Sequence, residues 1–282
     1  MTTLLAVPNV SEGRDRIAIA QIRDAFGVPV LDLHSDPDHH RTVLTMTGEP
    51  GALAPAVLTG AAEAIARIDL TGHVGTHPRV GAIDVAPIIY VRDTDRGAAC
   101  AEALVLADLL AHELGIPVFL YGELADGRTR ADLRRGGPIA LAGRLADGEL
   151  SADFGPQRLH PTAGAVLVAA RPPLVAFNLE LAPPATALDA QRIAAEIREG
   201  GEFGLPGVRA IGLWLEHRRV AQVSTNVEDH RRTTLADLVR AIERRARIAE
   251  AELVGLAPRD AFDGFPERIF VRNRRILEEV LS

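Results

Sequence analysis

Short apolar runs alternate with longer helix-like segments along the whole chain, and this alternation constrains the fold more than any other feature. Residues 4–7, 83–90 and 208–215 are apolar runs of strand length. Residues 53–68 and 188–198 have the length and periodicity of amphipathic helices. Such alternation is typical of layered α/β or α+β proteins. We therefore expect two two-layer α/β sandwiches, each with a mixed or antiparallel sheet and helices on one face.

The same pattern places the remaining elements. Further strands are expected at residues 28–33, 42–47, 117–121, 174–179 and 220–227, and further helices at 15–26, 94–114, 235–249 and from about 260 onward. Thr234 is the expected N-cap of the helix 235–249. Residues 126–164 have little periodicity, and long loops in compact proteins tend to be functional. Because the pattern restarts near Arg171, the 282 residues are expected to form two domains, 1–170 and 171–282.

Composition excludes several classes of protein. Hydrophobic residues make up 47% of the chain and charged residues 24%, as in folded globular proteins. The single cysteine, Cys100, excludes an internal disulfide and a multi-thiolate metal site, and fits a reducing cytoplasm. The sequence has neither a signal-peptide pattern at its start nor an apolar run of membrane-spanning length, so we expect a cytoplasmic protein without membrane association.

All 31 basic residues are arginine, because the sequence contains no lysine. Schiff-base catalysis and the phosphate-binding P-loop both need a lysine amine and are therefore excluded. Arginine instead favours fixed, bidentate grips on carboxylates. The net charge of -7 argues against binding to nucleic acid, which requires a basic surface.

Five of the nine histidines fall in the first third of the chain, and this clustering raises the question of a metal site. They are His34, His39, His40, His73 and His77. The last two stand four residues apart, as helical zinc ligands do, and neighbouring aspartates could complete a ligand set. However, Gly72 and Gly75 disfavour a helix there, and Pro78 follows the second histidine directly. We therefore expect no metal.

The segment 71–85 is better interpreted as a rigid catalytic loop. Its glycines permit unusual backbone angles, and Pro78 fixes the chain beside His77. An imidazole there could take a proton from one amine and give it to another, as acyl-type transfer between nitrogens requires. Arg79 could hold a substrate carboxylate. The alternative is that His77 only caps a strand end through a hydrogen bond.

Motifs in family order along nearly the whole chain resemble the formiminotransferase family. They include Val7–Arg14, the His-x-Gly-x-His-Pro-Arg loop at 73–79 with Val80–Val85 after it, Asp153–Pro156, Ala176–Leu179, Ala221–Asn226 and Leu253–Pro258. The resemblance covers only the transferase region of the bifunctional formiminotransferase-cyclodeaminase. Members are two-subdomain α/β proteins that pair as homodimers, so it implies an N-terminal subdomain over 1–170 and a C-terminal subdomain over 171–282.

The resemblance implies transfer of the formimino group of N-formimino-L-glutamate to N5 of tetrahydrofolate, a step of histidine degradation and one-carbon metabolism. The family's catalytic histidine falls on His77. Its folate-binding stretch falls on Gly155, Pro156, Gln157, Arg158, Leu159, His160, Pro161, Thr162, Ala163 and Gly164. Tetrahydrofolate is thus the expected co-substrate.

The residue types allow a mechanism in which His77 takes the N5 proton and then protonates the departing glutamate nitrogen. Arg41 and Arg79 are candidates for gripping substrate carboxylates, and an internal salt bridge is the alternative role for each. Many relatives have Asn-Arg at the positions of His40 and Arg41, and some have an acidic residue where this chain has His34. Both histidines are expected near the substrate pocket.

These differences leave N-formylglutamate open as the one-carbon donor, because an imine and an aldehyde oxygen make different hydrogen-bond demands. Two other classes also stay open. One is a folate-binding protein without turnover, and the other is a metal-dependent amidohydrolase that uses the histidine cluster.

Overall fold

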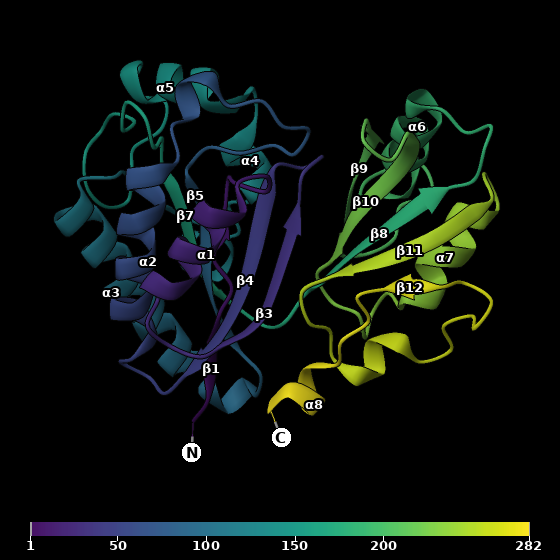
Figure 1. Cartoon of the computed structure of the whole chain (residues 1–282), viewed down its shortest axis with the longest axis horizontal. Coiled ribbons are helices and arrows are strands. Elements are labelled where there is room, and N and C mark those ends of the chain that lie inside the picture. The colour runs from purple at the N-terminus through teal and green to yellow at the C-terminus, as the bar shows by residue number, and fades with distance from the viewer. Residues whose placement is uncertain (1, 282) are drawn as a thin grey trace. The chain divides into compact units, whose positions relative to one another are not determined.

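The computed structural model of the chain describes residues 2–281. The chain divides into two compact units, Met1–Pro172 and Pro173–Ser282. Each unit has its own β-sheet and its own helices (Figure 1). This confirms the expected α/β architecture with two sheets, although the first unit has helices against both faces of its sheet rather than one.

The first unit contains a mixed sheet. Its strands are β1 (Leu4–Ala6), β2 (Asn9–Val10), β3 (Val30–Asp36), β4 (Arg41–Gly48), β5 (Ile83–Tyr90), β6 (Val118–Leu120) and β7 (Val166–Arg171). The order is β1-β4-β2-β5-β7-β6, with β3 paired to β4. Strand β7 runs parallel to β5 and β6, and the other pairs are antiparallel. Helical crossovers connect the parallel strands, as that arrangement requires.

Three helices of the first unit, α1 (Arg16–Ala25), α2 (Leu53–Arg67) and α3 (Arg96–Leu114), pack on one another beside one face of its sheet (Figure 1). They share a core with alternate residues of the strands, among them Ile88 and Val168. The residues between these, such as Leu167 and Ala169, point to a second core on the opposite face. Helices α4 (Arg130–Arg134) and α5 (Gly137–Ala146) close that second core.

The expectation that residues 126–164 are mostly irregular is therefore wrong in part. Two helices lie within them, and α5 buries Leu141 and Leu145. The sequence hides these helices because they are short and because Gly136 and Gly137 lie at the junction between them. Both glycines adopt positive φ angles, which allows the chain to turn sharply there.

The second unit has a mostly antiparallel sheet. Its strands are β8 (Val175–Leu181), β9 (Val208–Leu215), β10 (Val220–Val227), β11 (Ile248–Val254) and β12 (Val271–Arg272), in the order β12-β11-β8-β10-β9. Only the β11–β12 pair is parallel. Helices α6 (Ala187–Ile197) and α7 (Leu235–Glu243) contribute Ile193 and Leu238 to the same core as Phe177 of β8. A short helix, α8 (Leu277–Leu281), follows β12.

Two sequence expectations for this unit are wrong. The helix expected over 235–249 ends at Glu243, because Ile248 already begins β11. The helix expected from about 260 is a 3₁₀ turn, Arg259–Phe262, followed by a loop, β12 and α8. The N-cap is confirmed, since the Thr234 hydroxyl accepts a hydrogen bond from Asp237 N at 3.1 Å. Within residues 2–281, no helix combines the length and the apolar character needed to cross a bilayer.

Candidate active site

His77 lies in the loop between α2 and β5 and is held by a guanidinium from β4. Nη1 of Arg41 lies 3.1 Å from Nδ1 of His77 and also contacts Nε2 of that ring. Nη2 of Arg41 donates to Oδ1 of Asn9 in β2. Because a guanidinium only donates, the imidazole must accept and is therefore neutral. Two neighbouring strands thus fix the orientation of the loop histidine.

The surroundings of His77 favour its neutral form further. Burial lowers the pKa of His77 well below its ordinary value of 6.5, and the charges of Arg41 and Arg134 lower it more. Burial and the charge of Arg134 also lower the pKa of Arg41, to about 9. A neutral imidazole is thus available as a base at neutral pH.

Arg134 of α4 is neutralised, whereas Arg41 is not. Arg134 forms a salt bridge with the buried carboxylate of Asp84 in β5. Arg41 instead contacts His77 and Asn9, which are neutral. Nε of Arg41 is buried and has no hydrogen-bond partner among the described residues. A half-buried guanidinium with neutral partners retains an unbalanced charge that favours an anionic ligand.

Arg79 supports its own loop. Its Nη1 donates to the carbonyl oxygens of Gly75 and His77, each at 3.3 Å, and its Nη2 donates to the carbonyl oxygen of His73. These bonds tie the two ends of the loop together. Within residues 2–281, the guanidinium of Arg79 therefore hydrogen-bonds loop carbonyls and does not form the internal salt bridge that was considered from the sequence.

His40 and His73 stack beside a shallow hollow in the surface of the first unit. Their ring centroids are 4.1 Å apart, and Nδ1 of His40 accepts a hydrogen bond from Gly13 N at 3.1 Å. Burial and the charge of His73 lower the pKa of His40 to about 4. The hollow has a volume of about 570 Å³, and Glu12, Arg14, Arg67 and Asp69 line it together with the two histidines.

His39 faces another part of the cluster and pairs with a carboxylate. Its Nδ1 lies 2.9 Å from Oδ2 of Asp36, and its ring centroid lies 6.1 Å from that of His77. From the sequence, His39 and the neighbouring aspartates are only possible metal ligands. Asn9, Asp84 and Arg134 have no role assigned from the sequence. Asn9 and Asp84 lie inside motifs that resemble the formiminotransferase family, and this resemblance is the sequence signal that could have identified them.

The second half of the stretch 155–164 lies against the loop that carries His77. Leu70 N donates to Thr162 O at 2.8 Å, and Ala82 N donates to Ala163 O at 2.9 Å. His160 closes a turn by accepting from Ala163 N at 3.0 Å. Gly164 has a φ of +72°, and a Cβ atom there would lie 2.0 Å from Val80 O. The fold thus brings together two segments more than 80 residues apart.

The first half of the stretch has a different environment. Oε1 of Gln157 accepts from Ala152 N at 2.8 Å, so this side chain braces the preceding loop. Gly155 has a φ of +79° and packs beside Ala111 and Ile116. Arg158 and Pro161 are exposed, whereas Pro156, Leu159, His160 and Thr162 are half-buried. The exposed and half-buried side chains of the stretch 155–164 are accessible to a ligand.

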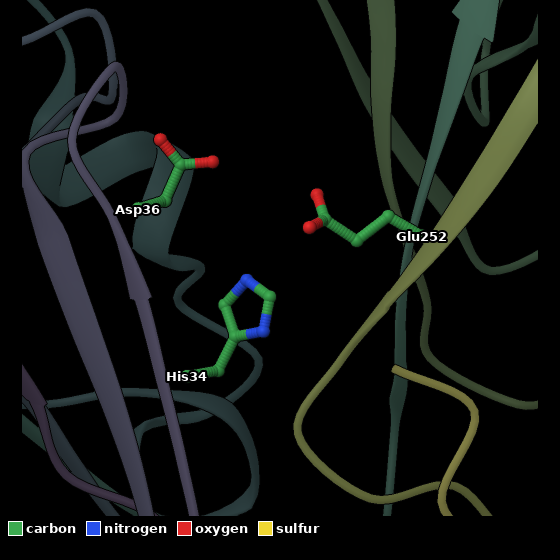
Figure 2. A group of neighbouring side chains, drawn as sticks. All are labelled: His34, Asp36 and Glu252. Carbon is green, nitrogen blue, oxygen red and sulfur yellow. The ribbon is translucent and has the colours of Figure 1, made fainter. Parts of the chain in front are cut away.

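Figure 2 shows the side chains of His34, Asp36 and Glu252. His34 and Asp36 project from β3 in the first unit, two residues apart and therefore on the same face of the strand. Glu252 belongs to β11 of the second unit, where its carboxylate lies 3.0 Å from Nη1 of Arg272. In the described part of the first unit (2–172), no three His, Cys, Asp or Glu side chains converge as metal ligands do. The histidine cluster is therefore assembled around hydrogen bonds and ring contacts.

An α/β protein with a neutral loop imidazole, held by a half-buried arginine, has a site whose residue types suit acid–base chemistry. The family model described as "Formiminotransferase domain, N-terminal subdomain" matches residues 3–171, and "Formiminotransferase domain" matches residues 176–278. The chain therefore belongs to the formiminotransferase family, which confirms the resemblance.

Curated relatives agree with this membership. The chain is 34% identical to a glutamate formimidoyltransferase of Streptococcus pyogenes over 90% of this chain and 89% of the relative. It is also 34% identical to one of Thermoplasma acidophilum, over 93% and 90%. Identity to the formimidoyltransferase-cyclodeaminase of Rattus norvegicus is 39%, over 89% of this chain. The chain spans about half the length of that bifunctional relative, 49%.

Proposed function

We propose that this protein is a glutamate formimidoyltransferase, which moves the formimino group of N-formimino-L-glutamate to N5 of tetrahydrofolate. The observation that carries the proposal is the neutral His77 in the family's loop, held by Arg41, which itself donates to Asn9. The names of the relatives from Streptococcus pyogenes and Thermoplasma acidophilum support the reaction.

The reaction needs two proton transfers that one imidazole can perform. N5 of tetrahydrofolate attacks the formimino carbon, and His77 takes the N5 proton as the new C–N bond forms. The bond from the same carbon to the glutamate nitrogen then breaks, and the imidazolium returns the proton to that nitrogen. Glutamate leaves, and 5-formiminotetrahydrofolate is the second product. Acid–base help of this kind accelerates a reaction about a hundred- to ten-thousandfold.

Arg41 links donor binding to the base. In the described structure the guanidinium occupies the lone pair of His77. A donor carboxylate is a stronger partner for a guanidinium than a neutral imidazole, because both groups of that pair are charged. A donor that draws Arg41 toward its carboxylate therefore frees His77 to accept the N5 proton. Arg79 and His40 contribute through the shape of the loop and through the hollow beside His73, and both remain candidate substrate contacts.

The residues 155–164 are the proposed folate-binding segment. Its contacts with residues 70 and 82 place it beside the loop that carries His77. In this proposal tetrahydrofolate is a co-substrate and no metal takes part. The domains 1–170 and 171–282 are the proposed N- and C-terminal formiminotransferase subdomains. The homodimer and the cytoplasmic location implied by the family resemblance remain predictions, and light scattering on the purified protein tests the former.

The test offers tetrahydrofolate with either formiminoglutamate or formylglutamate and measures glutamate release together with 5,10-methenyltetrahydrofolate after acid treatment. The proposal expects glutamate and folate product in equal amounts from formiminoglutamate, unchanged by a chelator. Release from formylglutamate alone would identify a formyltransferase. Release without tetrahydrofolate that a chelator abolishes would identify a metal-dependent amidohydrolase. Folate binding without any release would identify a binding protein.

A further inference from the structure

His39 is a buried imidazole with one nitrogen engaged and the other without a partner. Only 6% of the residue's surface is exposed. Nδ1 lies 2.9 Å from Oδ2 of Asp36, whereas Nε2 is buried and has no hydrogen-bond partner in residues 2–281. The ring lies next to His77, with 6.1 Å between the centroids. A buried polar atom left unpaired calls for an explanation, and contact with a bound ligand is one such explanation.

Asp36 fixes which nitrogen of His39 carries the proton. Its Oδ1 accepts from the backbone N–H groups of Asp38 and His39, each at 2.8 Å, and its Oδ2 faces the imidazole. A carboxylate so bonded stays ionised: burial alone would raise its pKa, but the hydrogen bonds from the His39 side chain and from the backbone of His39 and Asp38 help to lower it to about 2. An ionised carboxylate only accepts, so Nδ1 of His39 carries the hydrogen. In the neutral ring, Nε2 then presents a lone pair, and a buried N–H with no acceptor is avoided.

We propose that His39, with its tautomer set by Asp36, selects a formimino donor over a formyl donor. A formimino nitrogen carries N–H groups, and one of them can donate to Nε2 of His39. A formyl oxygen in the same position has no hydrogen to donate. Its lone pair would face the lone pair of Nε2, which repels it, and Nε2 would remain without a hydrogen bond. This inference rests on the proposed function and names the group that determines its donor. A site built around one hydrogen-bond direction rejects the opposite group, here by about ten- to a hundredfold.

The substitution Asp36→Asn tests the proposal because it reverses the direction of that bond. The amide oxygen can replace Oδ1 and keep both backbone hydrogen bonds, so the amide nitrogen then faces His39. That nitrogen donates to Nδ1, and the hydrogen of the imidazole moves to Nε2. The readout is the ratio of kcat/KM for formiminoglutamate to that for formylglutamate, with tetrahydrofolate as acceptor. We expect the ratio to fall at least tenfold, with formylglutamate gaining.

The matched control is Asp108→Asn, which alters another aspartate–histidine pair in the same unit. Asp108 and His112 lie 3.1 Å apart on the exposed face of α3. The control should leave the ratio unchanged. A merely structural role of Asp36 would lower both kcat/KM values together, so a constant ratio in Asp36→Asn would overturn the proposal. If the wild type releases no glutamate from formiminoglutamate, the proposed function itself fails, and the inference fails with it.

A second measurement does not depend on whether Asp36→Asn folds. Nitrogen NMR of the histidine side chains in the wild-type protein reports which ring nitrogen of His39 carries hydrogen, and His39→Gln identifies the signal. Hydrogen on Nδ1 with a bare Nε2 supports the proposal. Hydrogen on Nε2 overturns it. In His39→Gln the amide can rotate to present either a donor or an acceptor, so the preference between the two donors should shrink toward equality.

Discussion

Arg41 is half-buried and has neutral partners, which is an unusual arrangement for an arginine. Asn9 and the neutral His77 satisfy its terminal nitrogens, and the nearby Asp84 is already paired with Arg134. A charge in such surroundings is costly unless an anion joins it. The carboxylates of a glutamate donor meet this requirement, and this is the residue-level basis for placing the donor beside His77.

Replacing Arg41 by Gln should therefore raise the KM for formiminoglutamate by about ten- to a hundredfold, the value of a hydrogen bond between charged groups. Steady-state kinetics with the donor varied at saturating tetrahydrofolate measure the effect. Arg192→Gln is a suitable control, because Arg192 is exposed on α6 and pairs with Asp189. An unchanged KM in Arg41→Gln would show that the donor carboxylates bind elsewhere.

The lowered pKa of His77 predicts an unusual pH profile. Burial and the charge of Arg41 disfavour the imidazolium, so the base stays deprotonated well below pH 6.5. We expect kcat/KM to stay flat as the pH falls through 6.5 and to decline only in more acidic solution. In Arg41→Gln the loss of the positive charge raises the pKa of His77 and moves the decline to higher pH. A wild-type decline centred on pH 6.5 would contradict this account of the site.

At this scale the sequence identified part of the site. It singled out Arg41, His40, His73 and His77, and the structure brings these residues into one neighbourhood. It could not identify Asn9 as the support of Arg41, because the contact joins β2 to β4. The pairing of Asp36 with His39 was hidden for a different reason. A short Asp-x-x-His turn resembles many others, and only burial shows that Nε2 lacks a partner.

At the scale of elements, the contact between the loop and residues 160–164 depends on glycine. A Cβ atom at Gly164 would lie 2.0 Å from Val80 O, and the φ of +72° adds strain for any other residue. The same backbone carries Ala82 N to Ala163 O. The position of the His77 loop therefore depends on the close backbone contact between Gly164 and Val80, which leaves no space for a side chain at residue 164.

Gly164→Ala should destabilise the protein by about 2–4 kcal/mol, because it adds a clash to the strain of a positive φ. Gly148→Ala is the matched control. Gly148 has a similar φ of +71° but no atom within 4 Å of the added Cβ, so only the strain applies. Urea unfolding of both variants gives the two free energies of unfolding. Equal losses in the two variants would show that the approach to Val80 is not tight.

The sequence predicted elements well where local signals agreed and poorly where contacts distant in sequence decided them. Strand β5 (Ile83–Tyr90) is continuously apolar and buried on both faces, so length and composition were enough. Strand β11 was not expected, and the helix expected over 235–249 includes its first two residues, because the arginine-rich residues 244–247 continue a helical pattern. What defines β11 is its pairing with β8, which lies about 70 residues earlier. Strands β2 and β12 are two residues long and carry no periodicity.

At the scale of the whole molecule, an acidic protein surrounds a locally cationic site. The net charge is -7, yet the charges of Arg130 and Arg134 act on Arg41, and those of Arg41 and Arg134 act on His77. The effect is a local preference for anions that does not extend to nucleic acid, since binding there requires a basic surface. Folding must also keep several imidazoles neutral, and this makes stability depend on pH.

The unfolded chain binds protons at His77 below pH 6.5, whereas the folded protein resists them because its pKa there is lowered. This imidazole therefore contributes stability above pH 6.5 that is lost as the pH falls. Glu180 acts in the opposite sense, because burial raises its pKa to about 7. The test is therefore a difference: the free energy of unfolding of the wild type minus that of His77→Gln should decrease from pH 7.5 to pH 5. A constant difference would contradict the burial of a neutral imidazole.

The central claim is that His77 transfers the proton in formimino transfer to tetrahydrofolate. The most direct measurement is single-turnover glutamate release from formiminoglutamate by the wild type and by His77→Gln, with tetrahydrofolate binding measured on both. The account predicts a loss of about a hundred- to ten-thousandfold in rate with folate binding retained. A variant that binds folate and releases glutamate at the wild-type rate would contradict it.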